Sequence, residues 1–143
     1  MRYMIIVKSS GQREGADYDQ GVSTFEEMGK YNQSLVDAGI LLAAEGLSPS
    51  KDGATVTFKK GGQFVVKDGP FTEAKELVAG FWIIQVKSLD EAVEWAKRIP
   101  GFADGEHVEI RRVAEASDFA DVMSPDQIAA EEKMRDTIAS KAN

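Results

Sequence analysis

The stretch Leu77–Val86, LVAGFWIIQV, decides the fold because it combines strand-forming residues with apolar side chains at nearly every position. From Phe81 to Val86, only Gln85 interrupts the apolar run. Successive side chains of a strand point to opposite faces of a sheet, so both faces of this strand favour burial. Tyr3–Val7 shows the same property, since every residue in it is apolar or aromatic. We therefore expect the sheet to be covered on both faces.

Outward from this stretch, the chain predicts the order strand, helix, strand, hairpin, strand, helix, strand. Capping boxes, a helix-closing glycine and glycine turns give the boundaries. The predicted elements are a strand at Met1–Lys8, a helix from Ser23 or Thr24 to about Ala38, a strand from about Ile40, a hairpin over Ala54–Asp68 turned at Gly61 and Gly62, a strand at Leu77–Val86, a helix from Ser88 that ends before Pro100, and a strand at His107–Val113. This order predicts an α+β fold, a ferredoxin-like sheet with an inserted hairpin and two helices packed on one face.

A further helix is predicted near the C-terminus. Ser124-Pro-Asp-Gln has the capping-box spacing, with Pro125 at the first helical position. This helix lies outside the repeating pattern and is thinly apolar, so we expect it to dock on its own subunit or on a partner subunit. The predicted division is a domain over residues 1–115 and a C-terminal extension over residues 116–143.

Strands that are apolar on both faces raise the question of what covers the face opposite the helices. A second copy of the chain could cover it by packing its own sheet face to face. The alternative is that the hairpin and the C-terminal helix fold back over that face within one monomer. We expect the first arrangement, a homodimer.

Composition excludes several classes of function. The 143 residues carry 24 acidic and 17 basic side chains, a net charge of −7, which disfavours direct binding of nucleic acid or an anionic membrane surface. No apolar run approaches the roughly 20 residues that span a bilayer. With no cysteine and one histidine, the chain is expected to be cytoplasmic and to bind no metal and no cofactor.

Several motifs together resemble the YCII-related family, in the branch marked by Asp-Gly-Pro-Phe. They are RYMIIV at the N-terminus, AGILLAAEGLSP over Ala38–Pro49, DGPFTEAKE over Asp68–Glu76 and SLDEAVEWA over Ser88–Ala96. The resemblance implies a dimeric α+β barrel, two ferredoxin-like sheets packed together. It also implies a histidine and an aspartate in a cleft of some relatives. Asp37 falls near the aspartate position, and Met28 falls near the histidine position.

The segment Lys67–Glu76 supplies the first candidate site residues. Aspartate, glycine and proline favour a tight turn, and the following residues can form a single helical turn whose amino end could hold an anion. One interpretation is a rigid corner with solvated charges. The other is that Asp68, Phe71 and Glu73 line the rim of a ligand cleft.

Strand alternation supplies the other candidates. His107, Glu109 and Arg111 are predicted to point away from the helices, as are Gln85 with Phe81 and Ile83, and Glu45 with Leu41 and Ala43. Polar side chains on an apolar face either satisfy one another, as an ion pair of Arg111 with Glu45 or Glu109 would, or line a pocket. Catalysis would then use a carboxylate as general base, and the candidates are Asp68, Asp37 and Glu45.

These observations predict a protein that binds or converts a small organic molecule in a cleft of a dimeric α+β barrel, without a cofactor. The predicted ligand-binding residues are Asp68, Phe71, Glu73, Gln85, Glu109 and Arg111. The alternative hypothesis is a non-catalytic accessory module that senses a ligand or regulates transcription. It follows from the resemblance, because members of the branch occur encoded near, or fused to, extracytoplasmic-function sigma factors.

Overall fold

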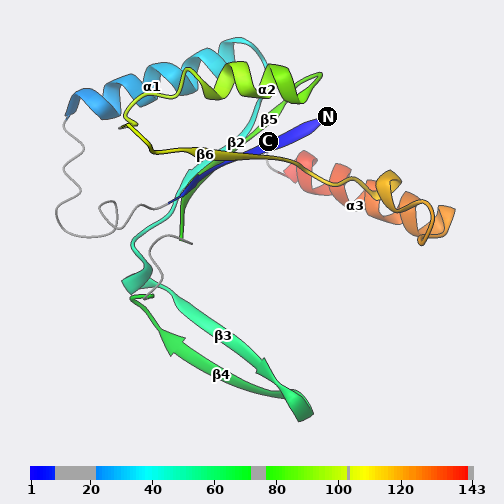
Figure 1. Cartoon of the computed structure of the whole chain (residues 1–143). Helices are drawn as coiled ribbons and strands as arrows, with labels where there is room; N and C mark the ends of the chain where they lie inside the picture. The colour runs from blue at the N-terminus through cyan, green and yellow to red at the C-terminus, as the bar shows by residue number, and fades with distance from the viewer. Residues whose placement is uncertain (9–21, 72–76, 103, 142–143) are drawn as a thin grey trace. The chain divides into compact units, whose positions relative to one another are not determined.

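The computed structural model describes residues 1–8, 22–71, 77–102 and 104–141 of the chain (Figure 1). The chain forms two compact units, Met1–Arg112 and Val113–Asn143.

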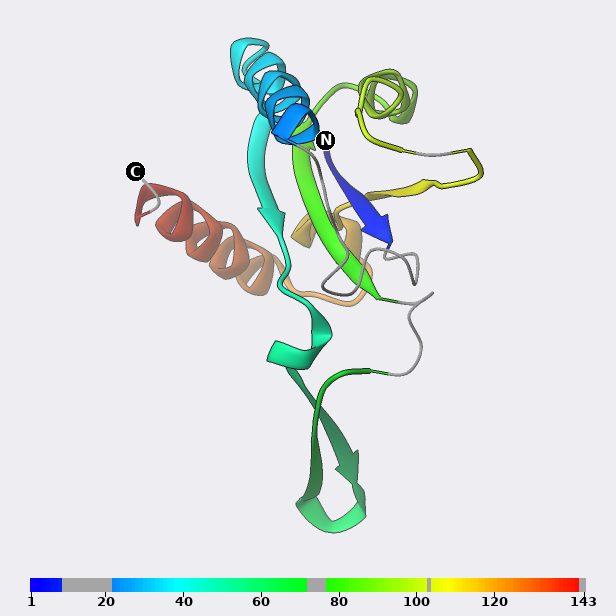
Figure 2. The ribbon, with the colours of Figure 1, turned by 90° about the vertical axis from the view of Figure 1, so that its left-hand side faces the viewer.

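The first unit is built on a four-stranded antiparallel sheet. Its strands are β1 (Arg2–Lys8), β2 (Leu41–Gly46), β5 (Val78–Gln85) and β6 (Val108–Arg112), and they lie in the order β2-β5-β1-β6. The helices α1 (Val22–Asp37) and α2 (Leu89–Ala96) lie on the same face of this sheet (Figures 1 and 2). A βαββαβ order with both helices on one face is ferredoxin-like, as the sequence predicts.

Local signals in the sequence set most of the helix boundaries. Gly39 closes α1 with a φ of 69°, a conformation that glycine adopts without strain. The Ser88 hydroxyl accepts a hydrogen bond from the Glu91 backbone N–H at 3.2 Å and caps α2. The start of α1 differs from the prediction, because the helix begins at Val22, before Ser23 and Thr24. Its cap position therefore falls outside the described residues.

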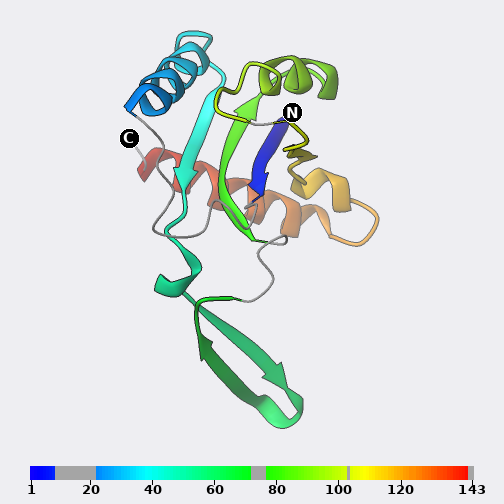
Figure 3. The same ribbon diagram turned by 60° about the vertical axis from the view of Figure 1, so that its left-hand side comes forward.

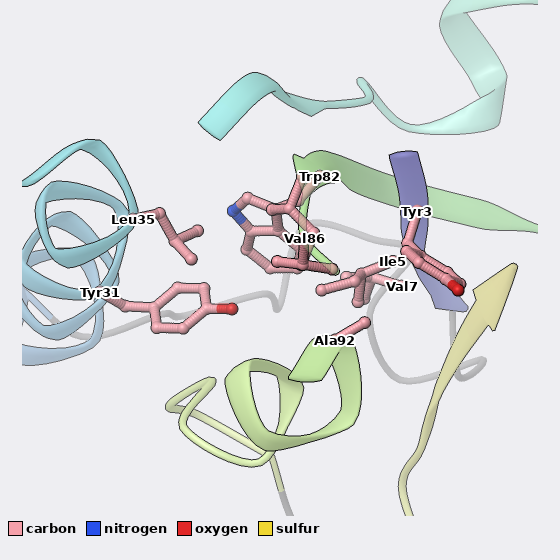
Figure 4. Close-up of a cluster of buried hydrophobic side chains, with 9 residues drawn as sticks. Tyr3, Ile5, Val7, Tyr31, Leu35, Trp82, Val86 and Ala92 are labelled. Atoms are coloured by element: carbon pink, nitrogen blue, oxygen red, sulfur yellow. The ribbon is translucent and has the colours of Figure 1, made fainter. Parts of the chain in front are cut away.

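The core lies between the sheet and the two helices (Figure 4). Trp82 of β5 packs against α1, where the Tyr31 ring meets its ring edge to face at a centroid distance of 5.6 Å. The largest fully buried side chains are Ile5, Leu35 and Ile84, one each from β1, α1 and β5. Burial of each of these side chains stabilises the fold by about 1.5–3 kcal/mol.

The sheet face opposite the helices is also apolar at its centre. On this face Met4 of β1 lies opposite Ile83 of β5, and Ile6 lies opposite Phe81. We call these four residues the open-face strip. The prediction that the central strands are apolar on both faces is therefore confirmed.

The inserted hairpin is a separate two-stranded sheet of β3 (Ala54–Lys59) and β4 (Gln63–Asp68), which extends away from the four-stranded sheet (Figure 3). Gly61 and Gly62 turn it with φ of 78° and 73°, as predicted. Phe58 and Phe64 face each other across the strands with ring centroids 5.6 Å apart, a pairing that stabilises the hairpin.

The second unit contains α3 (Pro125–Lys141), which begins with the predicted capping box. The Gln127 N–H donates to the Ser124 hydroxyl, and the Ser124 N–H donates to the Gln127 side chain at 2.8 Å. Over the residues that the structure describes, no helix is both long and apolar enough to cross a membrane.

Candidate functional site

A pocket of about 220 Å³ lies on the helix side of the sheet, between α1, one end of the strands and the segment after α2. We call it the α1 pocket. Most of its lining is apolar. The apolar residues are Val7, Met28, Ala44, Ala79, Phe81, Trp82, Pro100 and Phe102, and the remaining ones are Asn32, Glu45, Gly46, Gly80 and Gly101.

Two glycines form part of the pocket lining because they lack side chains. Gly46 of β2 and Gly80 of β5 are paired directly across the sheet, and the preceding pair on the same face is Ala44 with Trp82. A Cβ on Gly80 would lie 2.7 Å from the Glu45 carbonyl oxygen, so a glycine is required there. A Cβ on Gly46 would meet no atom within 4 Å. The space above Gly46 is therefore open.

Among the described residues of the pocket lining, Asn32 has the one uncharged polar side chain, and Trp82 holds it in place. The indole Nε1–H of Trp82 donates to Asn32 Oδ1 at 2.8 Å. The indole is itself fixed by its contact with the Tyr31 ring. A side chain fixed in this way can select a ligand by hydrogen bonding, since its orientation costs little further entropy on binding.

Tyr31 ties α1 to α2 beneath the pocket. Its hydroxyl donates to the Trp95 backbone carbonyl at 3.2 Å. Burial raises the pKa of Tyr31 to about 12, and the charge of Arg98 opposes part of this effect. The phenol is therefore neutral at physiological pH and acts as a hydrogen-bond donor.

Of the three catalytic candidates, only Glu45 lies in the α1 pocket. Glu45 is exposed and lies opposite Phe81 on the edge strand β2. Asp37 is the last residue of α1 and accepts a hydrogen bond from Gln33 Nε2 at 2.8 Å. Asp68 is the exposed last residue of β4. Neither Asp37 nor Asp68 is among the residues that line the α1 pocket.

The Asp-Gly-Pro-Phe turn closes the base of the hairpin. The Phe71 N–H donates to the buried Ser50 hydroxyl at 3.0 Å, and the Gly69 N–H donates to the Gly53 carbonyl at 2.9 Å. Phe71 lines a second pocket of about 370 Å³ beside Leu47, Ser50 and Gly53, apart from the α1 pocket. The predicted ligand-binding residue Glu73 lies outside the described residues.

The remaining candidates lie on strands β5 and β6. Gln85 is exposed opposite Arg2. Glu109 lies 3.5 Å from Lys8 Nζ and 3.7 Å from Arg111 Nε, so the predicted ion pair of Arg111 with Glu109 is present. The structure thus brings Glu109 and Arg111 together. Glu45 is on the same sheet face, as predicted, but on the far edge strand β2, and Phe71 lies at the hairpin base.

One prediction about strand faces was wrong. The pairing of β2 with β5 shifts between Leu41 and Ala43, so Leu41 packs against the core and does not share the face of Glu45. A β-bulge of this kind reverses the alternation of side chains. His107 precedes β6 and lines a pocket beside α2 together with Val93 and Ala96.

Sequence reasoning missed the α1 pocket, which draws on β1, α1, β2, β5 and the segment after α2. One signal could have indicated it. A glycine inside a strand pattern often marks a close approach of backbone or ligand, and both Gly46 and Gly80 interrupt apolar runs. Within the described ranges, no group of three or more His, Cys, Asp or Glu side chains could hold a metal ion.

Comparison with known proteins identifies the family. The chain is 37% identical over 71 residues to an uncharacterized protein of Rhizobium meliloti (strain 1021), and the match spans about half of each, 50% of this chain and 56% of the relative. A solved structure of the 5-chloro-2-hydroxyhydroquinone dehydrochlorinase TftG from Burkholderia phenoliruptrix AC1100, in complex with 2,5-dihydroxybenzoquinone, covers 80% of this chain. The alignment covers 95% of that enzyme at 16% identity and a TM-score of 0.40. The YCII-related domain matches residues 1–117, and the chain therefore belongs to the YCII-related family.

Proposed function

We propose that this protein binds a small, largely apolar organic molecule in the α1 pocket. The observation that carries the proposal is the open space above Gly46, which lies beside Trp82 and the fixed amide of Asn32. The volume of about 220 Å³ lies just below the 300–1,000 Å³ typical of ligand pockets, which favours a small molecule.

Binding is the activity that the geometry supports best. General acid–base catalysis needs a titratable group within hydrogen-bond reach of the reacting atom. Among the described residues of the pocket lining, Glu45 is the single titratable one, and it is exposed to solvent. Because Glu45 pairs with Phe81, its side chain belongs to the sheet face opposite the helices, and the lining of the α1 pocket therefore serves to bind and orient the ligand.

We also propose that the chain belongs to the Asp-Gly-Pro-Phe branch of the family and forms a dimeric α+β barrel. The motif at Asp68–Phe71 supports the first statement, because it closes the hairpin base through contacts with Ser50 and Gly53. The open-face strip supports the second, because an apolar sheet face is stabilised by packing against another sheet. The proposed ligand contacts in the α1 pocket come from a single chain.

The test is to fill the pocket from Gly46, where an added side chain meets no atom. Acetophenone and ethylbenzene serve as probes, and binding is followed by ¹H–¹⁵N NMR at the indole N–H of Trp82, with Trp95 as the internal reference. We expect Gly46→Ala to weaken binding of both probes and Gly46→Val to abolish it, while the melting temperature stays near that of the wild type.

Gly29→Ala is the matched control, because it adds one methyl group to α1 where no atom lies within 4 Å and Gly29 is not among the pocket-lining residues. It should leave binding unchanged and stabilise the helix by up to about 1 kcal/mol. Binding that survives Gly46→Val, or that perturbs Trp95 rather than Trp82, would contradict the proposed function.

A further inference from the structure

The hydrogen bond between Trp82 and Asn32 fixes which end of the Asn32 amide faces the tryptophan. An indole nitrogen is a donor only, so its partner must be an acceptor. At 2.8 Å from Trp82 Nε1, the Asn32 atom must therefore be Oδ1 and cannot be Nδ2. The amide cannot turn over without placing two donors against each other.

The Asn32 Nδ2 group is consequently held as a donor on the other side of the amide. Asn32 is half-buried and lines the α1 pocket. Within the described part of the chain, no protein acceptor hydrogen-bonds to Nδ2. Two N–H donors thus remain for water or for a ligand in the pocket.

The charges around the pocket determine which kind of acceptor suits these donors. Among the described lining residues none is a lysine or arginine, and Glu45 carries a negative charge at the edge strand. A carboxylate ligand would lose its hydration there without gaining an opposite charge, whereas a neutral carbonyl loses far less. The side chains of Trp82 and Phe102 would contact the apolar body of the ligand.

We propose that Asn32 is the specificity-determining residue of the α1 pocket, and that it selects small apolar ligands that carry a neutral carbonyl oxygen. The carbonyl accepts from Nδ2, and the apolar remainder occupies the space beside Gly46 and Gly80. This inference rests on the proposed function, since it concerns the ligand of that same pocket.

The experiment compares three probes of similar shape: acetophenone, ethylbenzene, which lacks the carbonyl, and benzoate, which is anionic. We expect the wild type to bind acetophenone at least about tenfold more tightly than either of the others. In the NMR titration, acetophenone should shift the side-chain NH₂ resonances of Asn32, and ethylbenzene should not.

Asn32→Asp is the matched variant, because its carboxylate can still accept from Trp82 while both donors are lost. It should remove the preference for acetophenone and leave the affinity for ethylbenzene within about twofold of the wild type. Trp82→Phe provides a second test, since it keeps an aromatic ring and releases the amide to turn. It should reduce the preference severalfold.

The possible outcomes separate the two proposals. Equal affinities of wild type for acetophenone and ethylbenzene, both blocked by Gly46→Val, would overturn the role of Asn32 and leave the pocket as the binding site. Tighter binding of benzoate than of acetophenone would overturn the preference for a neutral carbonyl. Binding of no probe at Trp82, or binding that Gly46→Val does not affect, would contradict the proposed function and this inference with it.

Discussion

At the scale of single residues, three glycines show that the lack of a side chain can have different structural consequences. Gly80 allows β2 and β5 to approach, Gly46 leaves pocket space open, and Gly69 allows the hairpin base to close against Ser50. Only at Gly46 does an added side chain find open space. Substitutions at the other two are therefore expected to act on stability.

Gly69→Ala should destabilise the protein by more than about 3 kcal/mol, because an added Cβ would lie 1.7 Å from the Ser50 carbonyl oxygen. Gly53→Ala is the control on the facing segment, where the nearest atoms to a Cβ lie 3.5 and 3.6 Å away, at ordinary contact distance. Urea denaturation of both variants measures the difference. Equal losses of unfolding free energy would show that the close contact with Ser50 does not determine the hairpin base.

Ser50→Ala should cost about 1–2 kcal/mol, because it leaves the Phe71 N–H without its acceptor in a half-buried setting. Asp68→Ala and Asp68→Asn should each change stability by less than about 0.5 kcal/mol, since within the described residues the exposed Asp68 side chain makes no hydrogen bond. Thermal melts of these variants show whether Ser50 or Asp68 stabilises the turn. If Asp68→Ala lost more than about 1 kcal/mol of unfolding free energy and Asp68→Asn did not, the Asp68 side chain would be the one that stabilises the turn.

At the scale of helices and strands, the sequence predicts those features that neighbouring residues determine. Ser88 and Ser124 cap their helices and Gly39 closes α1, because each signal acts over three or four residues. The face of Leu41 was mispredicted, since a bulge depends on how β2 pairs with β5. The α1 pocket was missed for the same reason, because contacts between distant segments assemble it.

The contact between α1 and α2 should make stability depend on alkaline pH through Tyr31. Its pKa is about 12 in the folded protein and 10.0 in the unfolded reference. The unfolded chain therefore releases the phenol proton first, so this contribution to stability is complete below pH 10 and is lost as the pH rises towards 12.

Urea unfolding of wild type and Tyr31→Phe at pH 8, 10 and 11 isolates this contribution, because phenylalanine has no proton to release. The difference in unfolding free energy between the two proteins should shrink from pH 8 to pH 11. A difference that stays constant over this range would show that Tyr31 titrates alike in both states.

At the scale of the whole molecule, the open-face strip is an apolar surface that the two helices of the ferredoxin-like fold do not cover. The helices α1 and α2 lie on the opposite face (Figure 2), while Met4, Ile6, Phe81 and Ile83 form the apolar centre of this one. The YCII-related domain spans residues 1–117, so this face belongs to the part of the chain that defines the family.

Light scattering at micromolar concentration should give a mass of about twice the 15.6 kDa of one chain, because two such apolar sheet faces can bury each other. Ile83→Lys should convert the protein to a monomer, since a buried charge without a partner is costly. Lys51→Ala, at an exposed position beside the hairpin base, is the control and should stay dimeric. A stable wild-type monomer would exclude the dimeric barrel.

The most direct measurement of the central claim is a crystal structure of the wild-type protein soaked with acetophenone. The account predicts the ligand in the α1 pocket, its ring beside Gly46 and Gly80 and its carbonyl oxygen about 2.7–3.2 Å from Asn32 Nδ2. An α1 pocket without ligand, in crystals where acetophenone occupies the hairpin-base pocket beside Phe71 or the open-face strip, would contradict it.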